Sequence, residues 1–247
     1  MKARGASYTA SRSERKLRKH PKLMLIVIEG LDGSGKSTQV KRLNEYLRGK
    51  YGIVEYIHFP RYDAPVYGSL ISRFLRGEFG DINQVHPQLV ALLFAEDRHG
   101  AAEEIRIAIE RGEAVLLDRY VYSNIAYQCA KLPSEEEAEE LRRWIVNTEY
   151  GDFALPRPDL NIFLDVPVGF VEKKLNSQRQ GGDRNYLEGG RDIHEASIEF
   201  QKKVRGFYLK QCEADPHFLR IDCSDKNGLM LPPDAIHAKI RAAVDAL

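Results

Sequence analysis

Residues 30–37 read Gly-Leu-Asp-Gly-Ser-Gly-Lys-Ser and follow a short apolar run at residues 23–28, with only Glu29 between them. They match the pattern GxxxxGK followed by Ser or Thr. The apolar run before them and the amphipathic segment 36–47 after them predict the strand and the helix that this pattern requires. Glycines in such a loop let backbone N–H groups point at phosphate oxygens, and the next helix presents its positive end to them. The stretch therefore predicts a phosphate-binding loop.

The rest of the chain alternates short apolar runs with longer amphipathic stretches. The apolar runs predict strands at residues 23–28, 54–59, 114–117, 160–164 and 218–221. Helices are predicted at residues 36–47, ending near Gly49, at residues 87–98, where Pro87 takes a favoured first-turn position, and after Ser134, which opens a capping pattern. Because parallel strands need crossover helices, this alternation predicts an α/β fold whose mostly parallel sheet is covered on both faces.

Length and composition favour one soluble domain. The 247 residues are 43% hydrophobic, which is enough for one substantial core. Lys plus Arg (37) nearly balance Asp plus Glu (36), so the net charge of +1 gives no case for nucleic acid or a membrane as partner. No apolar run is long enough to span a membrane. The three cysteines, Cys129, Cys212 and Cys223, form no CxxC pair, so we do not expect a zinc or redox centre. We expect a cytoplasmic location, where cysteines stay reduced.

Two segments differ from this domain in composition. Residues 1–22 carry eight Lys or Arg side chains against one acidic residue, Glu14, and we predict a disordered basic tail. A transit peptide or a tag remnant is the alternative for this tail. Residues 177–190 hold four glycines and mixed charges, which predicts a mobile loop. The predicted organisation is a tail at 1–22 and one phosphate-binding domain at 23–247, with a lid at about 177–192.

The residues of the phosphate-binding loop have distinct chemical roles in this prediction. Lys36 supplies a mobile charge for the β- and γ-phosphates of ATP, and the Ser37 hydroxyl is placed to bind Mg²⁺. A GTPase is disfavoured, because the nearest fragment to a guanine-reading NKxD segment, at residues 225–228, does not match it. Contacts with the phosphates are predicted for Gly30, Leu31, Asp32, Gly33, Ser34, Gly35, Lys36, Ser37 and Thr38.

Four further segments resemble the thymidylate kinase family, and they stand in the order that the family has. They are Phe59-Pro60-Arg61, the segment 93–98 (LFAEDR), Asp118-Arg119-Tyr120, and the segment 123–128 (SNIAYQ). With the phosphate-binding loop and the late glycine-rich loop they cover most of the chain. The resemblance implies a P-loop NTPase-type three-layer α/β/α fold with a five-stranded parallel sheet, transfer of the γ-phosphoryl group of Mg²⁺-ATP to dTMP, and a homodimer.

An acceptor phosphate is already a nucleophile, so this reaction needs positive charge and positioning more than a general base. Arg61, Arg98 and Arg119 stand at predicted strand or helix ends, where they could supply that charge. By resemblance, Arg61 and Arg119 would hold the acceptor phosphate, Arg98 would bind the pyrimidine edge while Phe94 stacks on the ring, and Tyr127 would crowd a 2′-hydroxyl. The full set implied for dTMP is Asp32, Phe59, Pro60, Arg61, Phe94, Arg98, Arg119, Asn124, Tyr127, Gln128 and Tyr186.

Catalytic and metal-binding residues are also implied by the resemblance. Asp118, at the end of the third strand, would contact Mg²⁺ through water together with Ser37; pairing of Asp118 with Arg119 is the alternative. Because Gly33 leaves no arginine inside the phosphate-binding loop, the late loop would supply the transition-state arginine, with Arg191 as the weakest candidate. The predicted catalytic set is Lys36, Arg119, Arg184, Arg179 and Asp32.

Two other functions stay open at this point. A deoxynucleoside kinase acting on a 5′-hydroxyl would need a carboxylate base near the acceptor, and the paired arginines argue against it. A non-catalytic nucleotide-binding module would be expected to lack some of the transfer residues, yet they are present. Among the other polar residues, Asp165 is predicted to cap the helix after Val166-Pro167, and the histidines are given no role because their spacing suits no metal.

Overall fold

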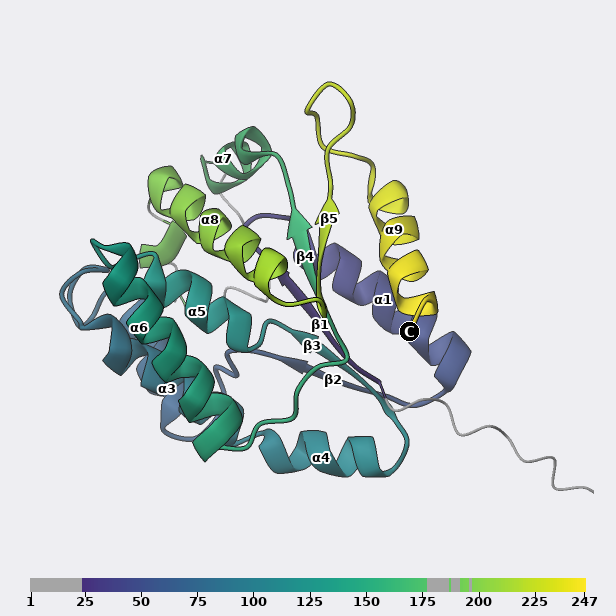
Figure 1. Ribbon diagram of the computed structural model, residues 1–247, viewed down its shortest axis with the longest axis horizontal. Coiled ribbons are helices and arrows are strands. Elements are labelled where there is room, and N and C mark those ends of the chain that lie inside the picture. The colour runs from purple at the N-terminus through teal and green to yellow at the C-terminus, as the bar shows by residue number, and fades with distance from the viewer. Residues whose placement is uncertain (1–23, 177–186, 188–191, 196) are drawn as a thin grey trace, which may run out of the picture.

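The computed structural model describes residues 24–176, 187, 192–195 and 197–247. Within them, a sheet of five parallel strands runs through the molecule in the order β2-β3-β1-β4-β5 (Figure 1). The strands are β1 (Met24–Gly30), β2 (Val54–His58), β3 (Ala114–Asp118), β4 (Leu160–Asp165) and β5 (Phe218–Asp222). The predicted α/β fold with a parallel sheet is thereby confirmed. The predicted tail at 1–22 and most of the predicted lid at 177–192 lie outside the described residues.

Helices connect the strands and cover both faces of the sheet. The α-helices are α1 (Lys36–Tyr51), α2 (Tyr67–Leu75), α3 (Pro87–His99), α4 (Ala102–Glu110), α5 (Val121–Cys129), α6 (Glu135–Val146), α7 (Val168–Asn176), α8 (Ile198–Ala214) and α9 (Pro233–Asp245). A π-helical turn, η1 (Asn147–Asp152), and a 3-10 turn, η3 (Ile193–Glu195), complete them. Figure 1 shows α1 and α9 on one side of the sheet and α5, α6 and α8 on the other. No helix among the described residues is long and apolar enough to cross a membrane.

The central strand β1 is buried along its whole length. Its side chains alternate between two hydrophobic clusters. Ile26 and Ile28 belong to the cluster that includes α1 and α9, whereas Leu25 and Val27 belong to the cluster that includes α4, α5 and α6. A parallel strand that is covered on both faces needs apolar residues at every position, which explains why the sequence shows a continuous apolar run here.

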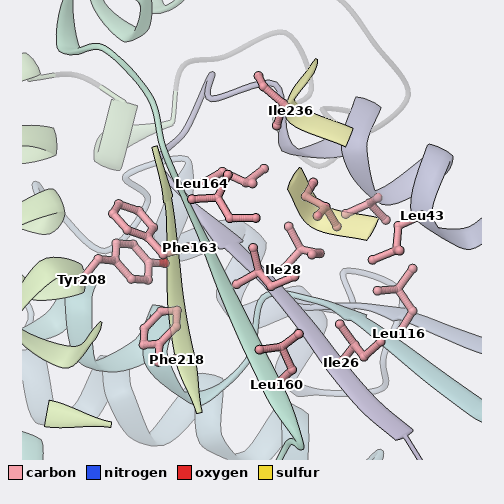
Figure 2. Close-up of a cluster of buried hydrophobic side chains, with 14 of the residues drawn as sticks. Ile26, Ile28, Leu43, Leu116, Leu160, Phe163, Leu164, Tyr208, Phe218 and Ile236 are labelled. Carbon is pink, nitrogen blue, oxygen red and sulfur yellow. The ribbon is translucent and has the colours of Figure 1, made fainter. Parts of the chain in front are cut away.

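An aromatic group attaches α8 to the sheet. Figure 2 shows Phe163 of β4, Tyr208 of α8 and Phe218 of β5 together on one side of the strands, with Leu43 and Ile236 on the other. The rings of Phe163 and Tyr208 stack with centroids 4.6 Å apart, and both residues are fully buried. This packing fixes the position of the Tyr208 hydroxyl, which reaches toward the phosphate-binding end of the sheet.

The predicted helix starts are correct, and one predicted end is not. The Ser134 hydroxyl accepts a hydrogen bond from the Glu137 backbone N–H at 3.2 Å, as the capping pattern predicts. The helix predicted to end near Gly49 continues to Tyr51 and ends at Gly52, the first residue after the helix start with a positive φ, at +88°.

Asp165 does not cap the next helix as predicted. Its carboxylate accepts hydrogen bonds from Arg205 (2.6 and 2.8 Å) and from Arg220 (2.7 Å). The side chain is buried, so two guanidinium groups that compensate its charge are a stronger attraction than a helix N-terminus. Asp165 therefore joins α8 and β5 to the end of β4.

Candidate active site

The phosphate-binding loop links the carboxyl end of β1 to α1, as the sequence predicts. Gly33 and Gly35 have φ values of +74° and +80°, a region where residues other than glycine are strained. A Cβ atom at Gly30 would lie 2.8 Å from Ser34 Oγ, so a larger residue here would require the Ser34 side chain to move. α1 begins without a side-chain cap and without an acidic residue in its first turn. Its first N–H groups therefore remain available for an anion.

The loop lysine is held by a carboxylate at the end of β3. Lys36 Nζ lies 2.5 Å from Asp118 Oδ1, and His58 Nδ1 lies 3.1 Å from Asp118 Oδ2. Burial alone would raise the pKa of Asp118, but the neighbouring Lys36 and His58 outweigh it and hold that pKa well below its usual value. The alternative in which Asp118 pairs with Arg119 is therefore wrong, because Lys36 and His58 occupy its carboxylate.

A pocket of about 520 Å³, a volume that includes space open to solvent, lies beside the loop. It brings together most of the residues predicted for the acceptor. Its lining comprises Asp32, Phe59, Pro60, Tyr62, Leu75, Phe94, Arg98, Arg119, Ser123, Asn124, Tyr127, Gln128, Asp192 and His194. Asp32 belongs both to this lining and to the phosphate-binding loop, so the two predicted sites meet there.

Arg119 lies where the loop and the pocket meet. One of its amino groups donates to Asp32 at 2.7 Å and to the Tyr127 hydroxyl at 3.3 Å, and Tyr127 donates to Asp32 at 2.8 Å. The residue has a φ of +69°, which is strained for arginine and is typical of residues held by their surroundings at functional sites. Burial would raise the pKa of Asp32, but Arg119 and the Tyr127 hydroxyl outweigh it and lower that pKa.

Behind Arg119, a buried polar network connects it to the core. The Glu29 carboxylate accepts from the hydroxyls of Ser123 (2.5 Å) and Tyr208 (2.9 Å), and Arg119 donates to the Ser123 hydroxyl at 3.1 Å. Burial raises the pKa of Glu29, although Ser123 and Arg119 oppose this shift. The network ties β1, α5 and α8 to the guanidinium that faces the pocket.

At another part of the pocket, Arg98 and Asn124 meet a carboxylate from outside the lining. Arg98 donates from Nε and Nη2 to Glu149 at 2.5 and 2.8 Å, and Asn124 Nδ2 donates to Glu149 at 2.9 Å and to the Ala91 carbonyl at 3.0 Å. Asn124 Oδ1 has no hydrogen-bond partner among the described residues. Burial alone would lower the pKa of Arg98, but the neighbouring Glu149 carboxylate outweighs burial and raises that pKa. Phe94 lines the same pocket.

Not every predicted acceptor residue reaches the pocket. Arg61 is absent from the lining, because its backbone N–H and Nε donate to Asp97 at 2.8 and 3.0 Å. Arg179, Arg184 and Tyr186 lie outside the described residues, as does Arg191. Their predicted roles stay predictions.

Several pocket residues were not predicted from the sequence. They are Tyr62, Leu75, Ser123, Asp192 and His194. The His194 ring packs against Tyr127 with centroids 5.3 Å apart, and burial, with help from Lys131 and Arg119, keeps its pKa well below the usual value. A neutral, aromatic histidine in a pocket has no spacing signal in the sequence. It could not have been found by a search for metal ligands.

The fold and this arrangement define the class of the protein. A loop that presents N–H groups and a buried lysine to phosphates stands next to a pocket that shares Asp32 with it. This is the design of a P-loop phosphotransferase with a small-molecule acceptor. The comparisons identify the family more closely.

The family model for thymidylate kinase matches residues 28–230. Among similar curated proteins, thymidylate kinase from Mycobacterium tuberculosis is 36% identical over 189 residues, which are 76% of this chain and 85% of that protein. Thymidylate kinase from Plasmodium falciparum is 32% identical over 201 residues, 81% of this chain and 82% of that protein. The solved structure of thymidylate kinase from Candida albicans is similar, with a TM-score of 0.68 and 28% identity over 90% of this chain and 91% of that chain. The chain belongs to the thymidylate kinase family of phosphotransferases.

Proposed function

We propose that this protein transfers the γ-phosphoryl group of ATP, bound at the phosphate-binding loop, to the phosphate of dTMP in the adjacent pocket. The observation that carries the proposal is the position of Asp32 and Arg119. Their ion pair of 2.7 Å stands where the loop meets the pocket. An acceptor phosphate bound by Arg119 would therefore face the end of ATP that Lys36 holds.

The base-reading end of the pocket supports thymine as the acceptor base. Thymine presents an acceptor, O4, next to a donor, N3–H. Arg98 can only donate, and Asn124 Oδ1 can only accept. The orientation of the Asn124 amide follows from its bonds, since Nδ2 donates to two oxygens, Ala91 O and Glu149 Oε1. Cytosine presents a donor and an acceptor in the reverse order, so it would leave buried polar groups unpaired.

The chain's own residues supply electrostatics and positioning. The phosphate of dTMP is a nucleophile at neutral pH because its second pKa is near 6, so no general base is required. Lys36 and Arg119 place positive charge on either side of the group being transferred, which stabilises the charge that spreads over it in the transition state. Tyr127, whose hydroxyl bonds Asp32, would crowd a 2′-hydroxyl and so favour deoxynucleotides.

Mg²⁺ fits the residues at the start of α1. The Ser37 side chain is exposed in the first turn, and the Asp118 carboxylate stands beside Lys36 with a lowered pKa, so both offer the oxygen ligands that Mg²⁺ prefers. Among the described residues, no three His, Cys, Asp or Glu side chains gather as a metal cluster. Ser37, and Asp118 through water, would hold the ion, which when bound neutralises phosphate charge.

The roles of the remaining predicted residues are proposed from the resemblance to the family. Arg61, which bonds Asp97 beside the pocket, is proposed to exchange that partner for the acceptor phosphate. Arg184, with Arg179 as second choice, is proposed as the transition-state arginine, and Tyr186 as a further acceptor contact. Resemblance to the family supports a homodimer and a cytoplasmic location. Light scattering at several protein concentrations would test the dimer.

A deoxynucleoside kinase remains the principal competitor and is less well supported. Its 5′-hydroxyl acceptor would need a carboxylate base, and two carboxylates line the pocket, Asp32 and Asp192. Asp192 accepts a hydrogen bond from the His194 backbone N–H at 2.7 Å. Arg119 and Tyr127 lower the pKa of Asp32, which makes it a poor base.

A coupled assay of ADP release with a panel of acceptors tests the proposal. We expect kcat/KM to be highest for dTMP, followed by dUMP, with dCMP, UMP and AMP at least about a hundredfold lower. Thymidine should be inactive as an acceptor. Comparable turnover of dCMP or AMP would contradict the thymine reading, and turnover of thymidine would favour the nucleoside kinase.

A further inference from the structure

Glu149 is a fully buried carboxylate that lies outside the pocket lining. It lies on η1, the π-helical turn that follows α6. It is 51 residues from its partner Arg98 in the chain. Buried carboxylates are costly unless they are paired, and such turns occur often at functional sites.

The carboxylate of Glu149 is shared between the two side chains that face the base. Oε2 accepts from Arg98 Nε at 2.5 Å, and Oε1 accepts from both Arg98 Nη2 at 2.8 Å and Asn124 Nδ2 at 2.9 Å. All of these groups are almost completely buried, with exposures of 2% for Arg98 and 3% for Asn124. A single carboxylate therefore fixes the plane of one guanidinium and the orientation of one amide.

The orientation of Asn124 determines what the pocket offers to a base. With Nδ2 on Glu149 and on the Ala91 carbonyl, Oδ1 is the free end. If the amide were turned by half a rotation, its N–H group would be the free end and would suit the N3 acceptor of cytosine. The carboxylate of Glu149 opposes that rotation, because it would then face an oxygen instead of a donor.

We propose that Glu149 is a positioning residue that sets the base specificity of the acceptor site. It acts through Arg98 and Asn124 and does not touch the substrate. This inference rests on the proposed function, because it assigns the base edge of the acceptor to these two side chains. It explains why a charge that serves no catalytic step is buried so far from water.

The geometry of η1 brings Glu149 into reach. The Phe153 backbone N–H donates to the Thr148 carbonyl at 2.8 Å, a bond across five residues that widens the helix. Thr148 and Glu149 are both buried, whereas Gly151 and Asp152 are exposed. The widened turn therefore directs Glu149 inward at the end of a helix whose outer face is solvated.

The test compares acceptor ratios in one enzyme preparation. E149Q keeps the shape but places an amide N–H₂ opposite Arg98 Nε in one orientation and opposite both Arg98 Nη2 and Asn124 Nδ2 in the other, so a donor always meets a donor. We expect the ratio of kcat/KM for dTMP over dCMP to fall at least about tenfold, mainly through a higher KM for dTMP, with the KM for ATP unchanged within about twofold. N3-methyl-dTMP lacks the N3–H group that Asn124 Oδ1 would accept from, so the parent should use it less well than dTMP. In E149Q this loss of kcat/KM should be smaller, because the contact with Asn124 is already impaired.

A matched control is D165N. Asp165 is a buried carboxylate bonded to two arginines, so its loss tests removal of a buried ion pair at a distance from the base end of the pocket. Both variants are expected to be less stable to heat, but only E149Q should change the acceptor ratio. The ratio cancels the fraction of active enzyme, so it stays measurable in a partly folded preparation. Should E149Q not fold, E149D keeps the charge with a shorter reach and should give an intermediate loss.

Three outcomes would separate the possible failures. An acceptor ratio in E149Q or E149D equal to that of the parent would overturn the positioning role and leave Glu149 as a structural ion pair. A parent enzyme that does not distinguish dTMP from dCMP would instead refute the proposed function itself, in which Arg98 and Asn124 recognise the thymine base. An equal fall of the ratio in D165N would also overturn the inference, since it would show a general effect of stability.

Discussion

Arg119 and Asp32 form an ion pair of 2.7 Å that joins the end of β3 to the phosphate-binding loop. The strained backbone of Arg119, with φ +69°, is held on both sides, since its N–H donates to the Ile28 carbonyl and its guanidinium to Ser123. A guanidinium that is fixed before it meets the transferred group needs little reorganisation during the reaction.

R119A is expected to lower kcat/KM for dTMP by at least about a hundredfold, because it removes a cation next to the transferred group. The KM for ATP should change little. Steady-state kinetics in both substrates checks this. R142A is the control, since Arg142 bonds Glu139 on the surface of α6, outside the pocket lining. A loss confined to ATP binding would place Arg119 on the donor side instead.

K36A should lose most turnover, by about a hundredfold or more, while the protein stays folded. The change removes charge from the β- and γ-phosphates, and His58 remains as a partner for Asp118. Circular dichroism and kcat measured on the same sample check both halves of the prediction. Unchanged kcat would refute the role of the phosphate-binding loop.

The ion pair of Asp118 predicts a pH-dependent stability. The pKa of Asp118 is lowered in the folded state, so the unfolded state takes up a proton first as the pH falls below about 3.8. The stabilisation is therefore complete from about one pH unit above that value and is lost progressively toward acid. The difference in unfolding free energy between the parent and D118N should narrow between about pH 5 and about pH 3. Urea unfolding at these pH values measures it, and a difference that widens toward acid would contradict the pairing.

The aromatic group at α8 predicts a large loss of stability for F163A. Phe163 is fully buried and stacks on Tyr208 at 4.6 Å, so its removal should cost about 3–5 kcal/mol of unfolding free energy. L219A on the neighbouring strand, where the side chain is 42% exposed, should cost less than about 1 kcal/mol. Denaturant unfolding of both variants compares them. Equal losses would show that the stacked rings contribute no special packing.

The glycine-rich segment supplies a prediction from sequence alone. The phosphate-binding loop has Gly33 where an arginine could stand, so we expect the transition-state arginine to come from the glycine-rich segment 177–190. R184A should therefore lower kcat by at least about a hundredfold, with less than about a fivefold change in the KM for dTMP. Such a pattern is expected for an interaction made mainly in the transition state. If R179A, R184A and the double variant all keep kcat within about threefold of the parent, these arginines only keep the segment soluble.

The sequence was informative wherever a function needs a local pattern. The phosphate-binding loop and the strands depend on residues that are adjacent in the chain, so glycine spacing and apolar runs predicted them. Asn124 and Arg98 were found because each stands in a recognisable segment of the family. The structure adds that both turn toward one pocket.

The partners of those residues could not be found in the same way. Glu149 stands in an unremarkable segment, and its role depends on a π-helical turn that no residue pattern predicts. Arg61 was assigned to the acceptor phosphate, yet Asp97, 36 residues further on, occupies its guanidinium. Asp165 was judged from the helix that follows it, whereas its partners come from α8 and β5. Long-range ion pairs therefore decided what local propensity left open.

The central place of β1 in the sheet also affects how the chain reaches its native state. β1 is made first but pairs with β3 on one side and with β4 on the other, so both of its edges stay open until residues far along the chain have been synthesised. Sheets built from such distant partners form slowly, because loop-closure entropy must be overcome before the pairing is gained. A nascent chain that stops before Leu160 would expose one edge of a strand whose first five residues are all apolar, which invites association with other chains. The phosphate-binding loop begins at the end of β1, so the strand that anchors it is paired on both edges only after β4 has been made.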